Sequence, residues 1–393
     1  MKPQNKTQLR DINEQNVLTR IMREPGIPRH EIAKAAGLSP AAVTGIVNRL
    51  LKAGLIRETG TESRGALGRR PTALWIVPDS RLFVGVEIAT REAAVALAGL
   101  DGVILERQII PFDADAGRYL GSIRNAVAQL ADSHPNMVAM GVSIPGTLDP
   151  KTGRLAASTH LHWHDMDLMQ ALTRDLHLPA IWDNNSNLAA VAERWFRDSR
   201  ESPLNDFVFV TLRVGLGTGL IANGTLIRGA RLHAGEFGHM TLYPGGTPCE
   251  CGRLGCWEEY AGDRALVREY GAGDSLTSVE IARRALEGEP RALAAVETVA
   301  QGLGEGLASI VLALNPAAIA VDDYAAAAWP IVEPVVNRIL RQLPSHWVDG
   351  LSVFPSSRTP LEGAIAGALS HYFAGGFGSV TAVGSASRSL QVV

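Results

Sequence analysis

Residues 206–229 read DFVFVTLRVGLGTGLIANGTLIRG, and this stretch decides the fold class. Three short apolar runs are separated by turns that contain glycine, which predicts three meandering strands. The same pattern occurs earlier, in the runs LFVGVEIA (82–89), EAAVALAGL (92–100) and GVILERQIIPF (102–112). Asp101-Gly102, between the last two of these runs, predicts a hairpin turn. Helices and strands alternate after each set, so the sequence predicts a duplicated, two-lobed α/β domain with a ligand cleft between its lobes.

The composition limits the class of protein. A chain of 393 residues is too long for one ordinary core, and 20% charged and 46% hydrophobic residues are typical of a soluble globular protein. No apolar stretch reaches the ~18 residues that a membrane span needs. The first residues, MKPQNKTQLRDINEQN, lack the apolar segment of a signal peptide. We therefore expect a cytoplasmic protein without membrane contact.

Charge is distributed unevenly along the chain. Residues 1–75 contain 13 Lys or Arg and 6 Asp or Glu, a balance of +7, whereas the whole chain has a net charge of −3. A basic N-terminal segment on an acidic body suggests that the segment binds a polyanion. Chance scatter of charge is the alternative, and the motifs within the segment decide between the two.

The basic segment predicts a helix-turn-helix. A helix over roughly 12–23 precedes PRHEIAKAAGLSPAAVTGIVNRLLKAGLI, in which Gly37 separates two short helices. Ser39 is a good N-cap and Pro40 suits the first helical position, so the second of these helices is predicted over about 40–53. The side chains predicted to form the shared core are those of Ile32, Val43, Ile46, Val47 and Leu50.

The outer face of that second helix carries small and polar residues, which suit entry into the major groove of DNA. Thr44 and Asn48 can reach base edges, whereas Arg49 and Lys52 are better placed for phosphates. The residues predicted to contact DNA from this face are Ser39, Ala41, Ala42, Thr44, Asn48, Arg49 and Lys52.

The next stretch, LIRETGTESRGALGRRPTALWIVP, predicts two strands joined by a glycine-rich loop. Such a hairpin after a helix-turn-helix is typical of a wing. Arg64, Arg69 and Arg70 at its tip are predicted to enter a minor groove. A helical module that binds another protein is the alternative interpretation of the N-terminal segment.

All three cysteines of the chain lie in one short window, CECGRLGC. An odd, clustered count argues against a secreted disulfide framework and for a metal site. With His239, the thiolates of Cys249, Cys251 and Cys256 form a set suited to tetrahedral zinc, and four protein ligands predict a structural ion. His233 is a second candidate for the imidazole. The alternative without a metal is a buried histidine beside three free thiols.

A second polar cluster, IWDNNSN (181–187), lies where a strand gives way to a helix, a usual location for a small-molecule site. One acid and three amides are a poor set for proton transfer. Glu236 and Glu258 flank the cysteine window, and carboxylates accept hydrogen bonds from sugar hydroxyls. Both glutamates are therefore candidates for binding a polyhydroxylated ligand, against the alternative that they are ordinary surface acids.

The chain resembles the ROK family, which joins sugar kinases and sugar-responsive repressors. The resemblance runs from about residue 16 to 374 and rests on LRVGLGTGLIANGTLIRGARLHAGEFGH, on CECGRLGCWEEY and on the helix-turn-helix with its GRRP wing. The wing is typical of the repressor branch, with its N-acetylglucosamine, glucose-phosphotransferase and xylose repressors. The resemblance implies an α/β fold, in which a two-lobed actin-like (ribonuclease H-like) domain follows an α+β winged helix-turn-helix domain.

The resemblance also implies a sugar site. His239 would bind zinc through one ring nitrogen and leave the other near the sugar. Ser186 and Asn187 are then expected to cap the helix that follows. The family's sugar contacts fall on Gly146, Thr159, Asn184, Asn185, Glu236, His239 and Glu258.

Four departures from the kinase members are informative. EIAT, with Glu87 for the acid, replaces a D-x-G-G-T phosphate loop, and Arg213-Val214-Gly215 replaces G-T-G. Asp322-Asp323 replaces a glycine pair near the nucleoside. Asn185 replaces the catalytic aspartate, and an amide cannot accept the proton of the attacked sugar hydroxyl. The resemblance therefore implies a kinase-like domain without kinase activity.

Together these features predict a sugar-responsive transcriptional repressor. It is expected to bind palindromic operator DNA as a homodimer or a dimer of dimers, with a sugar or sugar derivative biasing lobe closure and hence the spacing of its DNA-binding units. The predicted domains are a winged helix-turn-helix (1–78), a ROK domain (79–374) with a zinc-binding insertion near 239–256, and a flexible tail (375–393).

Two alternatives remain open. The first is a hexose kinase with an appended regulatory head, which would need Glu87 or Asp183 as its base. The second is a repressor that a transporter protein, rather than a sugar, removes from DNA.

Overall fold

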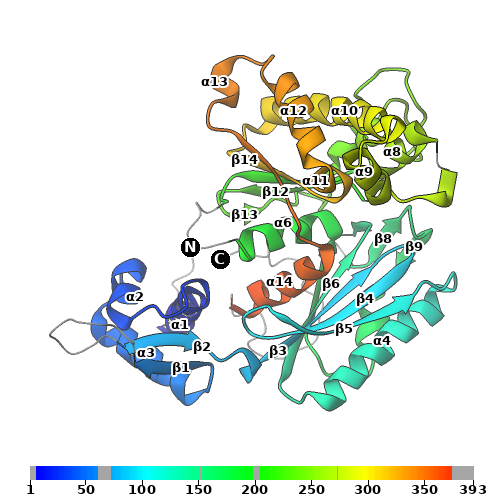
Figure 1. Cartoon of the computed structure of the whole chain (residues 1–393). Coiled ribbons are helices and arrows are strands. Elements are labelled where there is room, and N and C mark those ends of the chain that lie inside the picture. Colours follow the sequence, from blue (N-terminus) through cyan, green and yellow to red (C-terminus); the bar gives the residue numbers. More distant parts are fainter. Residues whose placement is uncertain are drawn as a thin grey trace.

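The computed structural model describes residues 6–60, 72–149, 152–197, 204–213, 215–271 and 273–373. A small N-terminal unit, called the head below, lies beside a larger body of two lobes (Figure 1). Each lobe is built on a five-stranded sheet. The predicted wing residues Arg64, Arg69 and Arg70 and the predicted tail at 375–393 lie outside the described residues.

The head is a helix-turn-helix followed by a two-stranded antiparallel sheet. Its elements are α1 (Lys6–Arg23), α2 (Arg29–Ala36), α3 (Pro40–Lys52), β1 (Ile56–Gly60) and β2 (Thr72–Ile76). Ser39 caps α3 by accepting a hydrogen bond from the amide of Ala42, as predicted. Gly37 ends α2 at a φ of 63°, a left-handed conformation that glycine adopts without strain. The predicted core is confirmed, since Ile32, Val43, Ile46, Val47 and Leu50 are at most 4% exposed.

The sheet of the first lobe has the strand order β10-β6-β3-β4-β5. Its antiparallel meander, predicted from the sequence, consists of β3 (Leu82–Ile88), β4 (Glu92–Ala98) and β5 (Ile104–Pro111). The parallel strands are β6 (Met137–Ile144) and β10 (Ala180–Asn184). Between them come α4 (Ala116–Ser133), β7 (Thr147–Leu148), β8 (Leu155–Ser158), β9 (Trp163–Met166) and α5 (Leu168–Thr173). The small sheet of β7, β8 and β9 is not predicted from the sequence.

The sheet of the second lobe has the order β13-β12-β11-β14-β15 and repeats the plan of the first. Its strands are β11 (Phe207–Thr211), β12 (Gly217–Ala222), β13 (Thr225–Leu226), β14 (Ala318–Val321) and β15 (Ser352–Pro355). Asn223 and Gly224 join β12 to β13 with positive φ at both residues, which is the type I′ hairpin geometry. The duplicated architecture is therefore confirmed, and only β15 is absent from the prediction for this sheet.

Helices surround the second sheet. They are η2 (Glu236–His239), α7 (Glu258–Ala261), α8 (Asp263–Tyr270), η3 (Gly273–Ser275), α9 (Ser278–Leu286), α10 (Pro290–Leu314), α11 (Asp323–Ala327), α12 (Trp329–Leu340) and α13 (Ser345–Val348). Over the described residues, no helix is both long enough and apolar enough to cross a membrane.

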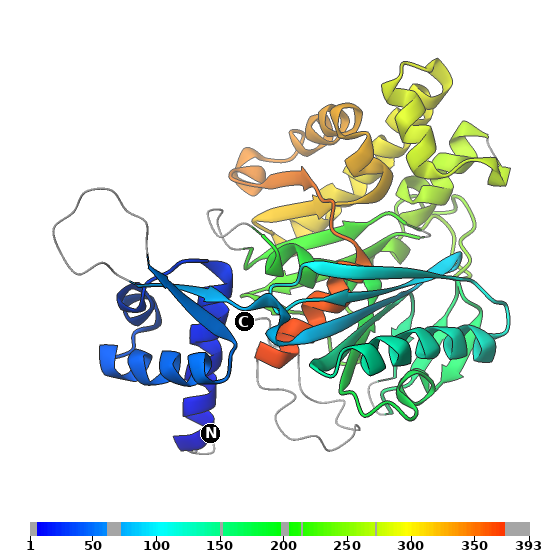
Figure 2. The same cartoon turned by 60° about the horizontal axis from the view of Figure 1, so that its bottom comes forward.

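Two helices fill the space between the sheets (Figures 1 and 2). The helix α14 (Pro360–Phe373) packs on β3 and β6 of the first lobe, and α6 (Asn185–Trp195) packs on β11 and β12 of the second. The two helices also pack against each other. Because α6 follows directly from β10 of the first lobe, this one helix is attached to both lobes.

Candidate functional site

The predicted sugar contacts of the first lobe are adjacent in the structure. Gly146 follows β6 and Asn184 ends β10, and the side-chain Nδ2 of Asn184 donates a hydrogen bond to the carbonyl of Gly146 at 3.0 Å. Thr159 follows β8, whose last residue, Ser158, donates its hydroxyl proton to the carbonyl of Pro145. These loops therefore meet at the carboxyl ends of the parallel strands, the usual ligand edge of such a sheet.

The start of α6 differs from the prediction. Its N-cap is Asn184, whose Oδ1 accepts a hydrogen bond from the amide of Ser186 at 2.8 Å. Asn187 is buried and donates to the carboxylate of Asp183 at 2.8 Å. The expectation that Ser186 and Asn187 cap this helix is therefore wrong. The physical reason is that the helix begins at Asn185, so the capping position falls on the last residue of the strand.

The predicted contacts of the second lobe lie on η2 and at the start of α7. Glu236 is exposed, whereas Glu258 is 7% exposed. His239 Nδ1 lies 3.1 Å from Glu258 Oε1, and the hydrogen bond that this carboxylate accepts raises the pKa of His239 to about 9. The two glutamates thus differ in environment. Glu236 is accessible to a ligand, whereas Glu258 is buried and its charge is partly compensated by His239.

The loop between β11 and β12 brings the two groups of residues together. A Cβ atom placed on Gly215 would lie 3.1 Å from Glu258 Oε2 and 3.1 Å from His160 Nε2. A Cβ on Gly217 would lie 2.1 Å from the hydroxyl of Ser186. Glycine is needed at both positions because a side chain there would displace these polar groups. Polar side chains of both lobes therefore surround one short loop.

His160 is not among the predicted residues, although it follows the predicted Thr159 in the stretch STHLHW. It is half-buried, and burial, with a contribution from Arg264, lowers its pKa below the usual value for histidine. At neutral pH the ring is then uncharged and can both donate and accept a hydrogen bond. Three histidines within five residues could have drawn attention to this loop, but only the fold shows which of them faces the second lobe.

A buried ion pair joins the lobes beneath these residues. Arg228 Nη2 lies 2.6 Å from Asp183 Oδ2, and the side chains are 13% and 3% exposed respectively. Asp183 also accepts hydrogen bonds from Asn187 Nδ2 and from the amide of Asn184. The carboxylate is therefore fully engaged with donors. It has no room for the role of replacement catalytic base that the kinase alternative would give it.

The His239 and cysteine side chains form a cluster. The donor atoms of His239, Cys249, Cys251 and Cys256 all lie within 4.8 Å of one another, and His233 is not part of this group. The sulfur atoms of Cys251 and Cys256 are 3.6 Å apart, and Cys249 Sγ is 3.7 Å from His239 Nδ1. Zn–S bonds of about 2.3 Å place tetrahedral neighbours roughly 3.8 Å apart, so the spacing fits that geometry. Without a metal, the Cys249 thiol donates a hydrogen bond to Glu258 Oε1 at 2.7 Å, so the cluster lies directly against a predicted sugar contact.

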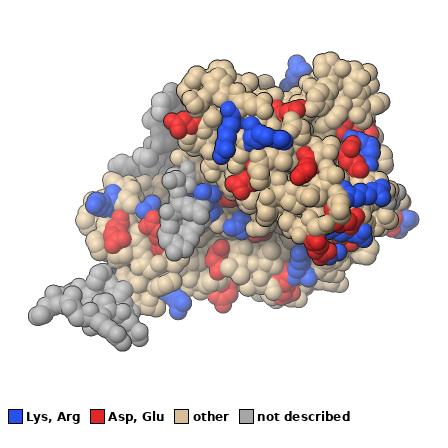
Figure 3. Space-filling view, turned by 45° about the horizontal axis from the view of Figure 1, so that its top comes forward, with Lys and Arg blue, Asp and Glu red and all other residues tan. Residues whose placement is uncertain are grey.

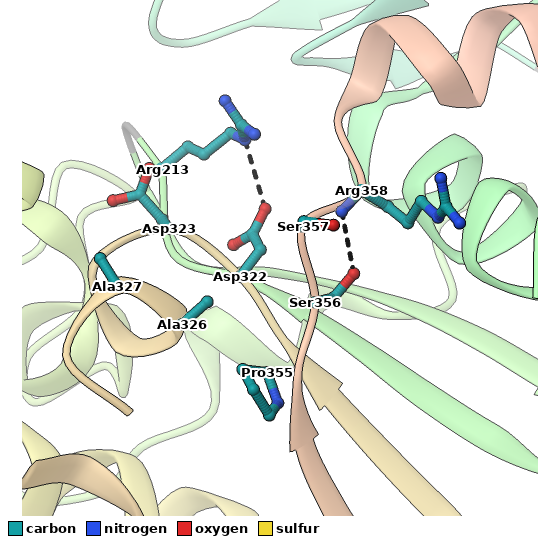
Figure 4. Close-up of a pocket in the computed structure, with 9 residues that line it drawn as sticks. All are labelled: Arg213, Asp322, Asp323, Ala326, Ala327, Pro355, Ser356, Ser357 and Arg358. Atoms are coloured by element: carbon teal, nitrogen blue, oxygen red, sulfur yellow. Dashed lines mark hydrogen bonds and ion pairs between the residues drawn. The ribbon is translucent and has the colours of Figure 1, made fainter. Parts of the chain in front are cut away.

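A second group of charged side chains lies where β11 and β14 end. Arg213, at the end of β11, lies with its Nε 3.2 Å from Asp322 Oδ2 (Figure 4). Asp322 also accepts hydrogen bonds from the amide of Leu212 at 2.8 Å and from the hydroxyl of Thr211 at 3.0 Å. Burial raises the pKa of Asp322 to about 6, although the guanidinium of Arg213 opposes this shift. A cavity of about 450 Å³ lies between this pair and residues 355–358.

Two further acids flank that pair. Asp323 has a φ of 54°, the left-handed region that glycine occupies most easily, and accepts a hydrogen bond from the hydroxyl of Ser278 at 2.9 Å. Glu87, from the first lobe, is half-buried, and its pKa is raised by burial and lowered in part by Arg213. Carboxylates from both lobes thus lie near one arginine.

The predicted DNA-binding face is accessible. Arg49 forms an ion pair with Glu14 at 2.7 Å, and Asn48 accepts a hydrogen bond from Arg29 at 3.2 Å. Arg29, which is not among the predicted residues, lies at the start of α2 and also pairs with Glu58. The predicted residues of this face that are exposed to solvent are Ser39, Ala41, Ala42, Thr44, Asn48, Arg49 and Lys52.

The body offers a different surface. On the face seen in Figure 3, basic and acidic side chains are interspersed over the described residues, and neither sign forms an extended patch there. A phosphate backbone is bound by clustered cations. The part of the body seen in this view therefore offers no clustered cations to a nucleic acid, and the exposed face of α3 stays the candidate interface.

The fold and these sites define a class: two-lobed α/β proteins with a polar cleft between the lobes and an N-terminal helix-turn-helix. The chain belongs to the ROK family, since the sequence model of that family matches residues 83–369. A model described as winged helix-turn-helix DNA-binding matches residues 10–57. The family confirms the actin-like fold that the resemblance implies.

Three similar proteins illustrate the relationship. The xylose repressor of Bacillus subtilis (strain 168) is 26% identical over 362 residues, which cover 89% of this chain and 92% of that protein. The crystal structure of a ROK family transcriptional regulator, a homologue of the E. coli MLC protein, gives a TM-score of 0.78 at 22% identity and covers 94% of this chain and 98% of that one. A ROK family glucokinase from Streptomyces griseus, in complex with glucose and AMPPNP, gives a TM-score of 0.64 at 27% identity and covers 72% and 97%.

Proposed function

We propose that this chain is a sugar-responsive transcriptional regulator that acts as a repressor. The head binds operator DNA through α3 and the wing, and the cleft between the lobes binds a sugar or sugar derivative. One observation carries this proposal: polar side chains of both lobes converge on the loop at Gly215 in a chain whose head presents an exposed recognition helix. The xylose repressor with which it aligns over most of its length supports the same function.

The sugar site is proposed to consist of the predicted residues together with His160. The loops at Gly146, Thr159 and Asn184 supply amide and backbone groups from one lobe, and Glu236 accepts hydrogen bonds from sugar hydroxyls on the other. The imidazole of His160 donates or accepts across the cleft. Asn185, at the first turn of α6, provides an amide where the kinase members have their base.

Zinc is the proposed occupant of the cysteine cluster. Three sulfur donors and one imidazole nitrogen are a set typical of structural zinc, and the four donors leave no open coordination position. The ion would hold η2 against the loop at 249–256. In this way it would fix Glu236 and Glu258 relative to each other.

The cleft is proposed to have no kinase activity. Arg213, Asp322 and Glu87 lie where the nucleotide phosphates would approach, and Asn185 cannot accept a proton. The kinase alternative draws support from the glucokinase of similar fold. The engagement of Asp183 by Arg228 argues against Asp183 as the replacement base.

We propose the domain boundaries and the assembly that the sequence predicts. We place the head at 1–78, the ROK domain at 79–374 and a separate tail at 375–393. A homodimer or a dimer of dimers is proposed, because a palindromic operator requires two heads related by symmetry. Cytoplasmic location is proposed with the same function.

A thermal-shift screen with D-glucose, D-xylose and N-acetyl-D-glucosamine tests the sugar site. A sugar at 100 times its Kd stabilises the folded state by about 2.7 kcal/mol, so one of the three is expected to raise the melting temperature by several degrees. Glu236→Gln is expected to remove that shift, whereas Glu269→Gln, which changes an exposed residue of α8, is expected to retain it.

Gel-shift experiments with promoter fragments upstream of sugar-uptake genes test DNA binding by the head. If no fragment binds in the presence or absence of sugars, the proposed function is wrong. If DNA binding is unchanged by every sugar but is reversed by a membrane extract, control by a transporter protein is favoured.

Asn185→Asp tests the loss of kinase chemistry. This variant restores the acid of the kinase members, yet we expect no ATP-dependent turnover in a coupled assay, because Arg213, Asp322 and Glu87 still occupy the nucleotide region. Sugar binding, measured by thermal shift, is expected to stay close to that of the wild type. Measurable turnover on any sugar of the panel would show that these side chains do not block nucleotide binding.

A further inference from the structure

The helix α6 connects the proposed sugar site with the head. Its first residues, Asn184 as the N-cap and Asn185, belong to the proposed site. At the last residue of α6, the guanidinium carbon of Arg23 lies 5.5 Å from the centroid of the Trp195 indole ring. Arg23 ends α1 of the head, which packs on α14 and lies beside it in Figure 1. One helix of 11 residues, about 16 Å long, therefore spans the distance between site and head.

The body of α6 is held tightly by its neighbours. All residues from Ser186 to Glu193 are buried. Glycines on two sides allow the approach: a Cβ on Gly217 of β12 would lie 2.1 Å from Ser186 Oγ, and one on Gly363 of α14 would lie 2.5 Å from the backbone carbonyl of Leu188. Closely packed cores shift between discrete arrangements and do not deform continuously. A change at the first turn of α6 is therefore transmitted to its last turn as a movement of the whole helix.

The contact between α6 and the head combines apolar packing with unfavourable polar features. Leu18 and Ile21 of α1 belong to the same continuous cluster of buried apolar residues as Trp195. Within the described part of the chain, however, Trp195 Nε1 at this contact is buried without a hydrogen-bond partner. Burial, together with the nearby charge of Arg23, lowers the pKa of Arg194 to about 10.

These features limit how strongly the head is held. A buried polar atom without a partner is destabilising, so the unpaired Nε1 of Trp195 offsets part of the gain from the apolar contact. A ligand can shift such a contact only if it binds the two arrangements of the head with different affinities. The docked head is therefore poised to respond to a movement of α6.

We propose that α6 transmits occupancy of the sugar site to the DNA-binding head through the contact of Trp195 with Arg23. This inference rests on the proposed function and specifies how the site is regulated. Binding between the lobes repositions the first turn of α6, and the last turn changes the packing of α1. The coupling is reciprocal, so loosening the head also changes α6.

Hydrogen–deuterium exchange of the full-length protein tests the link with matched variants. Arg23→Ala removes the cation from the Trp195 ring, and Arg20→Ala, one turn earlier on the same helix and paired with Glu24, is the control. In the wild type and in Arg20→Ala, the sugar that raises the melting temperature is expected to change exchange over residues 13–23 at least twofold. In Arg23→Ala the same sugar is expected to raise the melting temperature as much as in the wild type. The sugar-induced change in exchange over residues 13–23, however, is expected to fall below half of the wild-type change. In Arg23→Lys, which keeps a cation, the change in exchange over residues 13–23 is expected to lie between that of the wild type and that of Arg23→Ala.

The outcomes separate this inference from the proposed function. If a sugar binds and Arg23→Ala responds over 13–23 as the wild type does, the link through α6 is wrong and the sugar site stands. If no sugar of the panel binds, the sugar site is wrong, and the link is tested on the sugar-free protein. There Arg23→Ala, but not Arg20→Ala, is expected to increase exchange over residues 186–195, and equal exchange in both variants overturns the inference.

Discussion

His239→Ala is expected to abolish stoichiometric zinc binding and to lower the melting temperature by on the order of 10 °C. His239 supplies the only nitrogen donor of the four-atom cluster, so its loss leaves three thiolates and an open position. Structural zinc contributes about 10–16 kcal/mol in small zinc-finger peptides, and a fraction of that in a larger domain is still several kcal/mol. The measurements are zinc content per chain by atomic absorption and thermal unfolding, each on purified protein.

The matched control for this experiment is His233→Ala. His233 is exposed and lies outside the cluster, so the variant is expected to keep one zinc ion per chain and the wild-type melting temperature. Loss of zinc from His233→Ala with retention in His239→Ala would assign the imidazole ligand to the other histidine. Wild-type protein that contains no zinc, and whose stability a chelator leaves unchanged, would contradict the proposed metal site altogether.

Arg228→Met is expected to destabilise the protein by about 3–5 kcal/mol, because it leaves a buried carboxylate without its cation. Asp183 Oδ2 is 2.6 Å from Arg228 Nη2, and the aspartate side chain is 3% exposed, so water cannot replace the lost charge. For a domain of this size the loss corresponds to a fall in melting temperature on the order of 10 °C. Urea unfolding followed by tryptophan fluorescence measures the change in free energy.

Two further variants define the origin of that loss. Arg231→Met removes an exposed arginine three residues away and is expected to cost less than about 0.5 kcal/mol. Asp183→Asn combined with Arg228→Met removes both charges and is expected to recover most of the stability, giving a coupling free energy above about 2 kcal/mol in the double-mutant cycle. An Arg228→Met variant as stable as Arg231→Met would show that the pair contributes little across the lobe boundary.

Loss of zinc and loss of the Asp183–Arg228 pair are expected to affect different parts of the protein. Loss of zinc frees η2 and the loop at 249–256, so it is expected to weaken sugar binding through Glu236 and Glu258. Loss of the Asp183–Arg228 pair acts on the strand that leads into α6 and on the connection after β13. It is therefore expected to alter the relation between the two lobes.

Local patterns in the sequence predicted several features correctly because each depends on neighbouring residues. The N-cap at Ser39 and the turn at Gly37 follow from short-range hydrogen bonding and backbone sterics. The meander of β3, β4 and β5 follows from alternating apolar runs and the turn at Asp101-Gly102. The clustering of the three cysteines with His239 follows from their short separation along the chain.

Contacts between distant segments were not predictable in this way. His160 faces Glu258 only because the small sheet of β7, β8 and β9 directs its loop toward the second lobe. Arg228 meets Asp183 across 45 residues of sequence, and the start of α6 depends on how far β10 pairs with β6. No local pattern marks the approach of Trp195 to Arg23, which joins the body to the head.

The sequence by itself therefore determined the duplicated α/β plan, the helix-turn-helix and the cluster of one histidine and three cysteines, since these rest on periodicity, turn chemistry and residue type over short spans. Tertiary structure alone decided which polar residues of the two lobes face one another and how α6 connects the cleft with the head. The physical reason is that packing, which depends on shape and close approach at glycines such as Gly217 and Gly363, brings together groups that the chain separates by many residues.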